Sequence, residues 1–392
     1  MSAFDQVSDR LAWSSTKWEK YRGRDVIPLW IADMDFPVAP VIQEAISAQV
    51  AHGNYGYMLP PQALTQAMLD YHQRQYGWQI QSEWIVWLPG LVLGINLAVK
   101  ACCEAGQSAI SFSPAYPPFL RAPGLQGSEL LNIPFLPRPG CLTGALEYDI
   151  DFARLEAAIT PDTRLLQLCH PHNPLGRLYT GAELKRMAAL CERFNLFIAS
   201  DEVHCDLILD GVTKHVPFAL ALAEHAPQLV QRTITIAGPG KTYNLAGLGI
   251  GWAIIPDPVL RTRFVDGMQK LVPDPSCFAY SALQAALNDA EDWRQEALIY
   301  LRQNRDLTSQ ALDQMGLPHT HPAATYMTWI DARELVPKVG KVMVYFEKHG
   351  VGLSDGADFG QPGFVRLNFA CPRSLLIKAL ERMQSAVTAA KA

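Results

Sequence analysis

The sequence predicts an α/β fold whose larger domain contains a mainly parallel sheet flanked by helices. In the middle of the chain, short apolar runs alternate with segments of helical periodicity, which is the pattern of strands joined by crossover helices. A helix is expected at residues 180–193, where Thr180 and Glu183 have the spacing of a capping box. Strands are expected at residues 108–112, 165–169, 196–200, 233–237 and 250–255.

A second, smaller α+β domain is predicted from a change of pattern after about residue 290. A long charged helix at 291–315 leads into the strand-like segments A-T-Y-M-T-W-I-D and F-V-R-L-N-F-A, and a final helix begins near Arg373. We expect an N-terminal arm that also contributes to the small domain at residues 1–45, a large domain at 46–288 and a small C-terminal domain at 289–392.

The composition is typical of a soluble globular protein. Of the 392 residues, 49% are hydrophobic and 18% are charged, and the formal net charge of −5 gives no support to binding of nucleic acid or of an anionic membrane. The most apolar stretch, residues 84–103, is interrupted by proline and glycine, so it fits a strand, a turn and a buried helix rather than a membrane span. We expect no secretory signal. Eight scattered cysteines without a C-x-x-C pair predict neither a metal site nor a disulfide framework and favour the cytoplasm.

Polar or aromatic side chains follow four of the predicted strands. Tyr116 follows the first strand and Asn173 follows the second. Asp201 and His204 come after the third strand, and Lys241 comes after the fourth. Neighbouring parallel strands end at one edge of a sheet, where open α/β sheets bind their ligands. We therefore expect these five side chains to converge.

Each of these residues also has an ordinary structural interpretation. Asn173 could be a turn residue, and Asp201 could cap a helix or pair with an arginine. His204 could be a hydrogen-bonded core histidine, and Tyr116 could pack against its neighbouring prolines. Lys241 alone could be a solvated loop residue. The functional interpretation depends on the set as a whole.

Together, these groups are the ones that pyridoxal phosphate chemistry requires. A lysine forms the imine, a carboxylate keeps the pyridine nitrogen protonated, and an aromatic face stacks on the ring. Phosphate needs backbone N–H groups at the start of a helix, and Gly90, Leu91 and Val92 could supply them, although the same glycine could belong to an ordinary strand-to-helix turn. The sequence therefore predicts pyridoxal 5′-phosphate as the cofactor and no metal.

The chain resembles the fold type I pyridoxal phosphate enzymes of the class I/II aminotransferase superfamily through the ordered motifs P-G-L-V, S-P-A-Y, H-P-H-N-P-L-G-R, S-D-E-V-H and G-K-T-Y-N-L-A-G-L. Two further segments, P-L-W-I-A-D-M-D-F and G-F-V-R-L-N-F-A-C-P-R, are typical of the MalY/PatB-type C–S lyases, which are cystathionine β-lyases of the aminotransferase type. The resemblance spans nearly the whole chain. It implies a seven-stranded type of sheet and a homodimer with shared active sites.

The resemblance also implies a role for each matching residue. Lys241 would form the Schiff base and remove the substrate α-proton, and Arg366 would bind the substrate α-carboxylate. Tyr57 resembles a tyrosine that reaches the phosphate in the partner subunit's site. The implied catalytic residues are Lys241, Tyr116 and Asp201; the implied cofactor contacts are Gly90, Leu91, Val92, Tyr116, Asn173, Asp201, His204, Lys241 and Tyr57; and the implied substrate contacts are Arg366, Asp33 and Tyr57.

Three departures from the family pattern bear on the site. Gly238 and Gly240 stand where the family commonly has serines that help to hold phosphate, so cofactor affinity or tilt is expected to differ. His170 replaces the asparagine that begins N-P-H-N-P, and Ala323 and Ala324 replace the glutamate and glycine of E-G-T-Y. None of these changes removes a catalytic group, but they weaken any inference of substrate preference from the branch.

The leading functional hypothesis is β-elimination from a sulfur amino acid, with release of a thiol, pyruvate and ammonia. An aminotransferase is the alternative, because it uses the same groups and diverges after a shared intermediate. A ligand-sensing or protein-binding regulator that retains the fold is a further alternative. A purely non-catalytic role is disfavoured because the chain retains the catalytic and binding residues Lys241, Asp201, Asn173 and Arg366.

Overall fold

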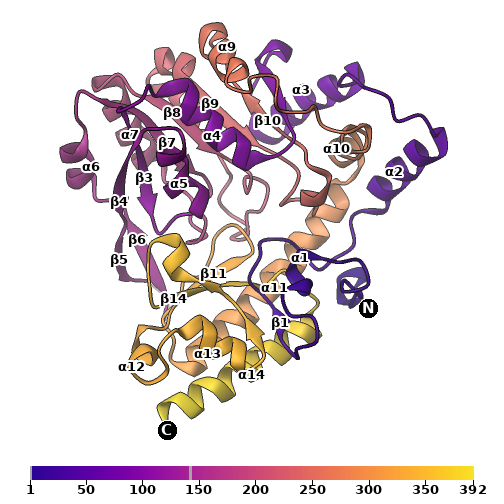
Figure 1. The fold of residues 1–392 in the computed structure, drawn as a ribbon, viewed down its shortest axis with the longest axis vertical. Coiled ribbons are helices and arrows are strands. Elements are labelled where there is room, and N and C mark those ends of the chain that lie inside the picture. Colours follow the sequence, from indigo (N-terminus) through magenta and orange to yellow (C-terminus); the bar gives the residue numbers. More distant parts are fainter. Residues whose placement is uncertain (1, 141–143) are drawn as a thin grey trace.

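A seven-stranded sheet forms the centre of the computed structural model, which describes residues 2–140 and 144–392 (Figure 1). Strand β10 runs antiparallel to both of its neighbours, β2 and β9, and the other pairings in the sheet are parallel, so the sheet is mainly parallel. In spatial order the strands are β2 (Ile85–Leu88), β10 (Gly251–Ile254), β9 (Thr233–Ala237), β8 (Phe197–Asp201), β7 (Thr163–Cys169), β3 (Ser108–Ser113) and β4 (Glu129–Pro134).

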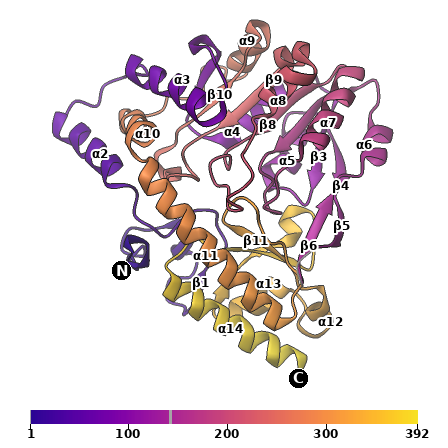
Figure 2. The same ribbon diagram turned by 180° about the vertical axis from the view of Figure 1, so that it is seen from behind.

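Helices cover both faces of this sheet, because successive side chains of a strand point to opposite sides. Ala109 and Leu165 pack in a core cluster with one group of helices, whereas the adjacent Ile110 and Leu166 pack with the other group. Figures 1 and 2 show these two layers from opposite sides. The first group is α4 (Leu91–Cys102), α5 (Pro117–Leu125) and α9 (Pro258–Asp266), and the second is α6 (Phe152–Ala158), α7 (Gly181–Arg193) and α8 (Phe218–His225).

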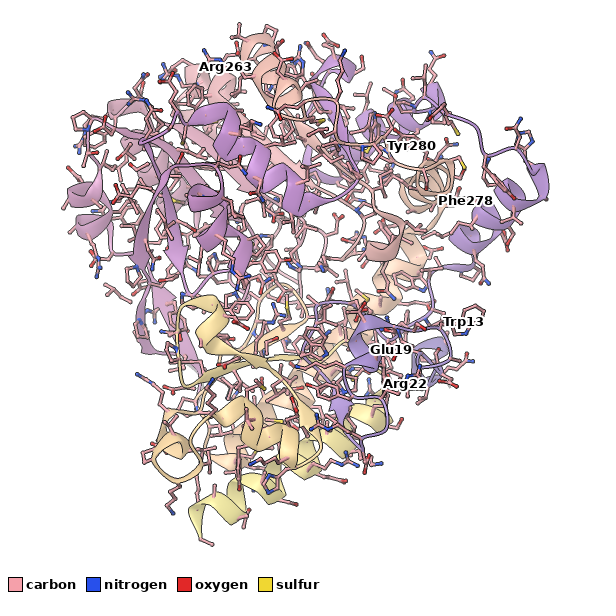
Figure 3. All side chains as sticks on the ribbon, viewed as in Figure 1. Trp13, Glu19, Arg22, Arg263, Phe278 and Tyr280 are labelled. Atoms are coloured by element: carbon pink, nitrogen blue, oxygen red, sulfur yellow. The ribbon has the colours of Figure 1, made fainter. Side chains whose placement is uncertain are left out.

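A third group of helices lies at the β2 edge of the sheet. Helix α10 (Cys277–Asp289) packs against both α2 (Pro40–His52) and α3 (Gln62–Tyr76). Its Tyr280 is buried, while the neighbouring Phe278 packs its ring against Tyr55 from the segment between α2 and α3, with ring centroids 5.2 Å apart (Figure 3).

The predicted elements of this part of the chain are confirmed with small shifts at their ends. Strand β9 has the predicted bounds, and β7 begins two residues early, where the Ser108 hydroxyl donates to Thr163 Oγ1 at 3.1 Å. The capping box of α7 is present, because Thr180 Oγ1 accepts from the Glu183 backbone N–H and the Glu183 carboxylate accepts from the Thr180 N–H. A short antiparallel pair, β5 (Leu136–Pro139) and β6 (Leu146–Asp149), lies outside the main sheet.

The C-terminal part of the chain forms a separate three-stranded antiparallel sheet in the order β11 (Met327–Asp331), β14 (Phe364–Asn368) and β13 (Ser354–Asp355). The long α11 (Glu291–Met315) runs from α10 towards this sheet (Figure 1). The N-terminal strand β1 (Ile27–Pro28) pairs in parallel with β12 (Val351–Gly352), which places the first residues of the chain beside the last hundred. The remaining helices are α1 (Thr16–Glu19), α12 (Val336–Val339), α13 (Val342–Lys348) and α14 (Arg373–Lys391).

Two general features follow from the described residues. None of the helices in this part of the chain is long and apolar enough to cross a membrane. The cysteines at positions 102, 103, 169, 191, 205, 277 and 371 are all free thiols, and six of these seven are buried. Cys141 lies outside the described residues.

A buried ion cluster fixes the N-terminal segment to the rest of the molecule. The Lys17 side chain is fully buried, and its Nζ lies 2.7 Å from Asp35 Oδ2 and 3.5 Å from Asp33 Oδ1. Asp35 also accepts hydrogen bonds from Arg10 and from the indole N–H of Trp18. Together these interactions hold the pKa of Asp35 below its usual value even though burial alone would raise it. Removing Lys17 would leave the buried Asp35 without full compensation of its charge.

We expect Lys17→Met to lower the free energy of unfolding by about 3 kcal/mol, because it leaves Asp33 and Asp35 with an uncompensated buried charge. The control is Arg22→Met, which removes the exposed pair between Arg22 and Glu19 on the same segment (Figure 3) and should cost less than about 1 kcal/mol. Urea unfolding at one protein concentration compares the two variants. Equal losses from both substitutions would contradict the assignment.

Candidate active site

The polar strand ends of the large sheet open into a cavity of about 550 Å³. β3, β7, β8 and β9 are consecutive parallel neighbours in the sheet, so their carboxyl ends lie together. The cavity is also lined by residues of the N-terminal segment and of the three-stranded sheet, which places it where the two parts of the chain meet. Every predicted cofactor residue except Tyr57 lines this cavity, and so does Arg366.

Lys241 lies directly beyond β9, and its amine faces the N-terminal segment. Its Nζ donates to the Ala32 carbonyl oxygen at 2.5 Å. Desolvation and the positive charge of Arg366 lower the pKa of Lys241 to about 8, while Asp33 and Asp201 act in the opposite direction. At pH 7 about a tenth of the side chain is therefore the neutral amine, the form that acts as a nucleophile or base, compared with less than about a thousandth for an ordinary lysine.

Asp201 is a buried carboxylate at the end of β8. Its Oδ1 accepts from the Val203 backbone N–H at 3.1 Å, and within the described residues no lysine, arginine or histidine forms an ion pair with it. Burial raises the pKa of Asp201 to about 7. The nearby His204 is also buried, and its Nδ1 has no hydrogen-bond partner in the described part of the chain. Both side chains are thus available to polar groups of a ligand.

Arg366 is held in the cavity wall by partners from three segments. Nη1 donates to Asn173 Oδ1 at 3.0 Å, and Nη2 donates to the Trp30 carbonyl at 2.8 Å and to Ser354 Oγ at 3.3 Å. The guanidinium lies over the Phe359 ring, 4.7 Å from its centroid. Burial lowers the pKa of Arg366 to about 10, which still leaves it charged at neutral pH, and Nε has no partner within the described residues. This edge can bind a carboxylate.

The start of α4 supplies the predicted anion site. Gly90 is its N-cap, and Leu91 and Val92 are its first residues, so their backbone N–H groups are free of partners within the helix. The helix has 12 residues, and its first turn lines the cavity. A phosphate at this end of the cavity would be bound by backbone N–H groups and by the helix dipole.

The two glycines that precede Lys241 are closely packed. A Cβ atom at Gly238 would lie 3.1 Å from the Ile250 carbonyl oxygen and 3.2 Å from the Gly251 Cα. At Gly240, a Cβ atom would lie 3.3 Å from the Ala246 Cα. These neighbours are backbone atoms, so serines at the two positions would require local shifts. The absence of a side chain at these two positions therefore fits the close packing around them. It also means that positions 238 and 240 offer no hydroxyl group to an anion.

Tyr116 and Tyr57 occupy different environments. Tyr116 follows β3, is half-buried in the cavity wall, and has its pKa raised by burial and by Asp201. Tyr57 is fully exposed and lies outside the cavity lining, on the segment between α2 and α3. Tyr57 could therefore reach a cofactor only in the site of another molecule.

Asp33 lies outside the cavity lining of the described structure. Its expected contact with substrate is not seen there and stays a prediction. Its Oδ2 accepts from Arg10 at 2.7 Å, and its Oδ1 lies 3.5 Å from Lys17 Nζ. Its negative charge still acts on the site by raising the pKa of Lys241. Its role in the described structure is electrostatic and structural.

Several contacts of the site were not indicated by sequence motifs. The carbonyl oxygens of Trp30 and Ala32 accept from the arginine and lysine side chains, and the Ser354 hydroxyl bridges to Trp30. The Tyr326 hydroxyl also donates to the Ala32 carbonyl at 3.1 Å. Backbone acceptors carry no sequence signature, and Ser354 is recognisable only once β13 is paired with β14 opposite Arg366.

The residues present fit pyridoxal phosphate. Asp201 is a buried carboxylate without a cationic partner in the described chain, which suits a protonated ring nitrogen. A helix start suits the phosphate, and Lys241 is an amine of lowered pKa that can form an imine. Asn173, His204 and Tyr116 line the space between these groups.

We expect Lys241 in the cofactor-free protein to react with a small amine-directed reagent with an apparent pKa of about 8, compared with about 10.4 for an ordinary lysine. Arg366→Met removes a positive charge and should raise this pKa, whereas Asp201→Asn removes a negative charge and should lower it. Peptide mass spectrometry across a pH series measures the labelling. Shifts in the opposite directions would contradict the electrostatic description.

Comparison with known proteins gives the family of the chain. Residues 24–383 match the family model of aminotransferase class I and II. A curated relative named cystathionine beta-lyase PatB, from Bacillus subtilis strain 168, is 33% identical, and the match covers 98% of this chain and 100% of that protein.

Solved structures also match this chain over nearly its full length. The crystal structure of OvoB has 41% identity and a TM-score of 0.92, covering 99% of each chain. Cystalysin from Treponema denticola, described as containing a pyridoxal 5′-phosphate cofactor, has 27% identity and a TM-score of 0.92, also over 99% of each chain. The architecture is that of the fold type I enzymes, and the chain belongs to the aminotransferase class I and II family.

Proposed function

We propose that this protein is a pyridoxal phosphate-dependent C–S β-lyase of the cystathionine β-lyase type. The observation that carries the proposal is the convergence of Lys241, Asp201 and Arg366 on one cavity. The relative from Bacillus subtilis and a second relative from Corynebacterium glutamicum, which is 30% identical over 97% of this chain, both bear the name cystathionine beta-lyase. The net reaction takes a cysteine thioether and water to a thiol, pyruvate and ammonia.

The bound cofactor supplies an aldehyde for imine formation and a ring that withdraws electrons from the substrate α-carbon. Asp201 would hold this ring at its nitrogen, Asn173 and His204 would flank it, and Tyr116 would cover its face. Backbone N–H groups at the start of α4 would hold its phosphate. We also propose that residues 46–288 form the cofactor-binding domain, with residues 1–45 and 289–392 forming the smaller one.

Arg366 and Lys241 have different roles toward the substrate, namely binding and proton transfer. Arg366 binds the α-carboxylate and fixes the orientation of the α-carbon relative to Lys241. Its own position is fixed by Asn173, Trp30 and Ser354. Lys241, with a pKa near 8, takes the α-proton as a neutral amine and can return it to the departing sulfur.

We further propose that the protein is a cytoplasmic homodimer. The free thiols of the described residues fit a reducing compartment. Tyr57 and Leu59 are almost completely exposed on one segment, and Tyr55 beside them is also exposed. A partner subunit that covers this segment would bury apolar side chains and bring Tyr57 to the phosphate of its own site.

The purified holoenzyme is expected to release pyruvate and thiol from L-cystathionine without an added 2-oxo acid. Lys241→Ala should lower kcat by about 10³, because it removes the general base, and should abolish the borohydride-reducible absorbance band. Coupled pyruvate detection and thiol titration measure the products. Amino-group transfer that requires a 2-oxo acid would identify an aminotransferase instead, and the absence of both products would favour a binding protein.

Subunit complementation tests the shared site. Lys241→Ala and Tyr57→Ala homodimers should each have low activity, whereas a mixed dimer contains one site with an intact Lys241 and an intact Tyr57. Coexpression with two affinity tags isolates the mixed dimer, and its activity per site pair should recover towards half of the wild-type value. A mixed dimer no more active than the mean of its parents would show that each site is complete within one chain.

A further inference from the structure

Part of the cavity wall near Arg366 is made of residues with their own chemical character, and one of them, Asp358, is exposed to solvent. This region, which we call the mouth, is lined by Trp30, Met343, Asp355, Asp358 and Phe359. Asp355 ends β13, and Asp358 lies in the short 3₁₀ helix Gly356–Phe359 that follows. The two aspartates of the mouth therefore belong to the same stretch of chain that supplies Ser354 and the Phe359 ring to Arg366.

The position of Arg366 determines which part of a substrate reaches the mouth. Arg366 is 5% exposed, lines the same cavity, and has an unpartnered Nε among the described residues. With the α-carboxylate at Arg366 and the α-amine at the Lys241 end, the rest of the cavity belongs to the group on sulfur. This assignment rests on the proposed lyase function and is independent of the charge at the mouth.

The two carboxylates of the mouth lack cationic partners. Asp355 Oδ1 accepts from the Ala357 backbone N–H at 3.0 Å, Asp358 is exposed, and neither forms an ion pair with any described residue. Lys20 also lines the cavity, but its Nζ lies 4.0 Å from Glu347 and 4.7 Å from the centroid of the Trp30 ring. Glu347 is itself paired with Arg24 at 2.8 Å, so the positive charge of Lys20 is only partly compensated, and the mouth has two carboxylates against this one ammonium.

We propose that the mouth selects substrates whose leaving thiol carries a cationic group, such as an ammonium. In the elimination the Cβ–S bond breaks, the sulfur leaves with the bonding electron pair and gains a proton, and water converts the remaining three-carbon fragment to pyruvate and ammonium. The cationic group takes no part in this chemistry. It pairs with Asp355 and Asp358 while the α-carboxylate pairs with Arg366, so the substrate is fixed at both ends.

Two other occupants would use different parts of the mouth. An anionic leaving group would require Lys20 to exchange Glu347 for the substrate and would face both aspartates. A neutral apolar group would contact Met343 and Phe359 and would leave both carboxylates without a partner. Each of these alternatives gives a distinct result in the same experiment.

The test compares three S-substituted cysteines with the holoenzyme at neutral pH. S-(2-aminoethyl)-L-cysteine is cationic, S-propyl-L-cysteine is its neutral isostere, and S-(2-carboxyethyl)-L-cysteine is anionic. Their thiols differ as leaving groups, so the informative quantity is the change in each kcat/KM between wild type and Asp355→Asn/Asp358→Asn. Asp70→Asn, which removes one negative charge from the exposed face of α3 outside the cavity, is the control for a loss of charge elsewhere on the molecule.

The double variant is expected to lose about tenfold in kcat/KM for the aminoethyl substrate and less than about twofold for the propyl substrate, while the carboxyethyl substrate improves. Asp70→Asn should leave all three values in their original ratio. Equal losses of kcat/KM for all three substrates would indicate a structural role of the aspartates and overturn the proposal. The proposal would also be overturned if the double variant had the same ratio of kcat/KM values among the three substrates as the wild type. Failure of every thioether to yield pyruvate would instead overturn the lyase function itself.

Discussion

The active site depends on one irregular stretch of backbone, residues 30–36, whose carbonyl oxygens are bonded from both parts of the molecule. From the small sheet, Arg366 donates to the Trp30 carbonyl, and Asn368 donates to those of Ile31 and Asp33. From the large sheet, Lys241 donates to the Ala32 carbonyl. A shift of this stretch would therefore change the positions of Lys241 and Arg366, the proposed imine-forming and carboxylate-binding residues, together. Asn244, three residues beyond Lys241, completes the set by bonding to the carbonyls of Met34 and Phe36.

The ion cluster beneath this stretch fixes its register. Asp33 and Asp35 both meet Arg10 and Lys17, and neither aspartate lines the cavity. A shift that separated the buried Asp35 from these cations would cost several kcal/mol. The same cluster contributes to the chemistry, because Asp33 opposes the lowering of the Lys241 pKa by Arg366. Local sequence thus sets the geometry of the site and part of its electrostatics.

Sequence reasoning succeeded where a residue type and its place relative to a strand carried the information. The strands that precede Tyr116, Asn173, Asp201 and Lys241 are neighbours in the sheet as predicted, because short apolar runs followed by polar residues are local signals. The resemblance did not show that Arg10 and Lys17 pair with Asp33 outside the cavity lining, because these ion pairs join residues that no motif connects. It also missed every backbone acceptor of residues 30–36, since the pairing of β1 with β12 joins segments more than three hundred residues apart.

Burial and charge at Asp201 also bear on how strongly this site binds its cofactor. Burial raises the pKa of Asp201 to about 7, so keeping it ionised at neutral pH opposes folding unless a cation offsets the desolvation. A protonated ring nitrogen provides that cation, and its binding would be coupled to the stability of the fold. Serines at positions 238 and 240 would require local shifts of the backbone, and with glycines there the backbone N–H groups at the start of α4 are the donors available to a phosphate.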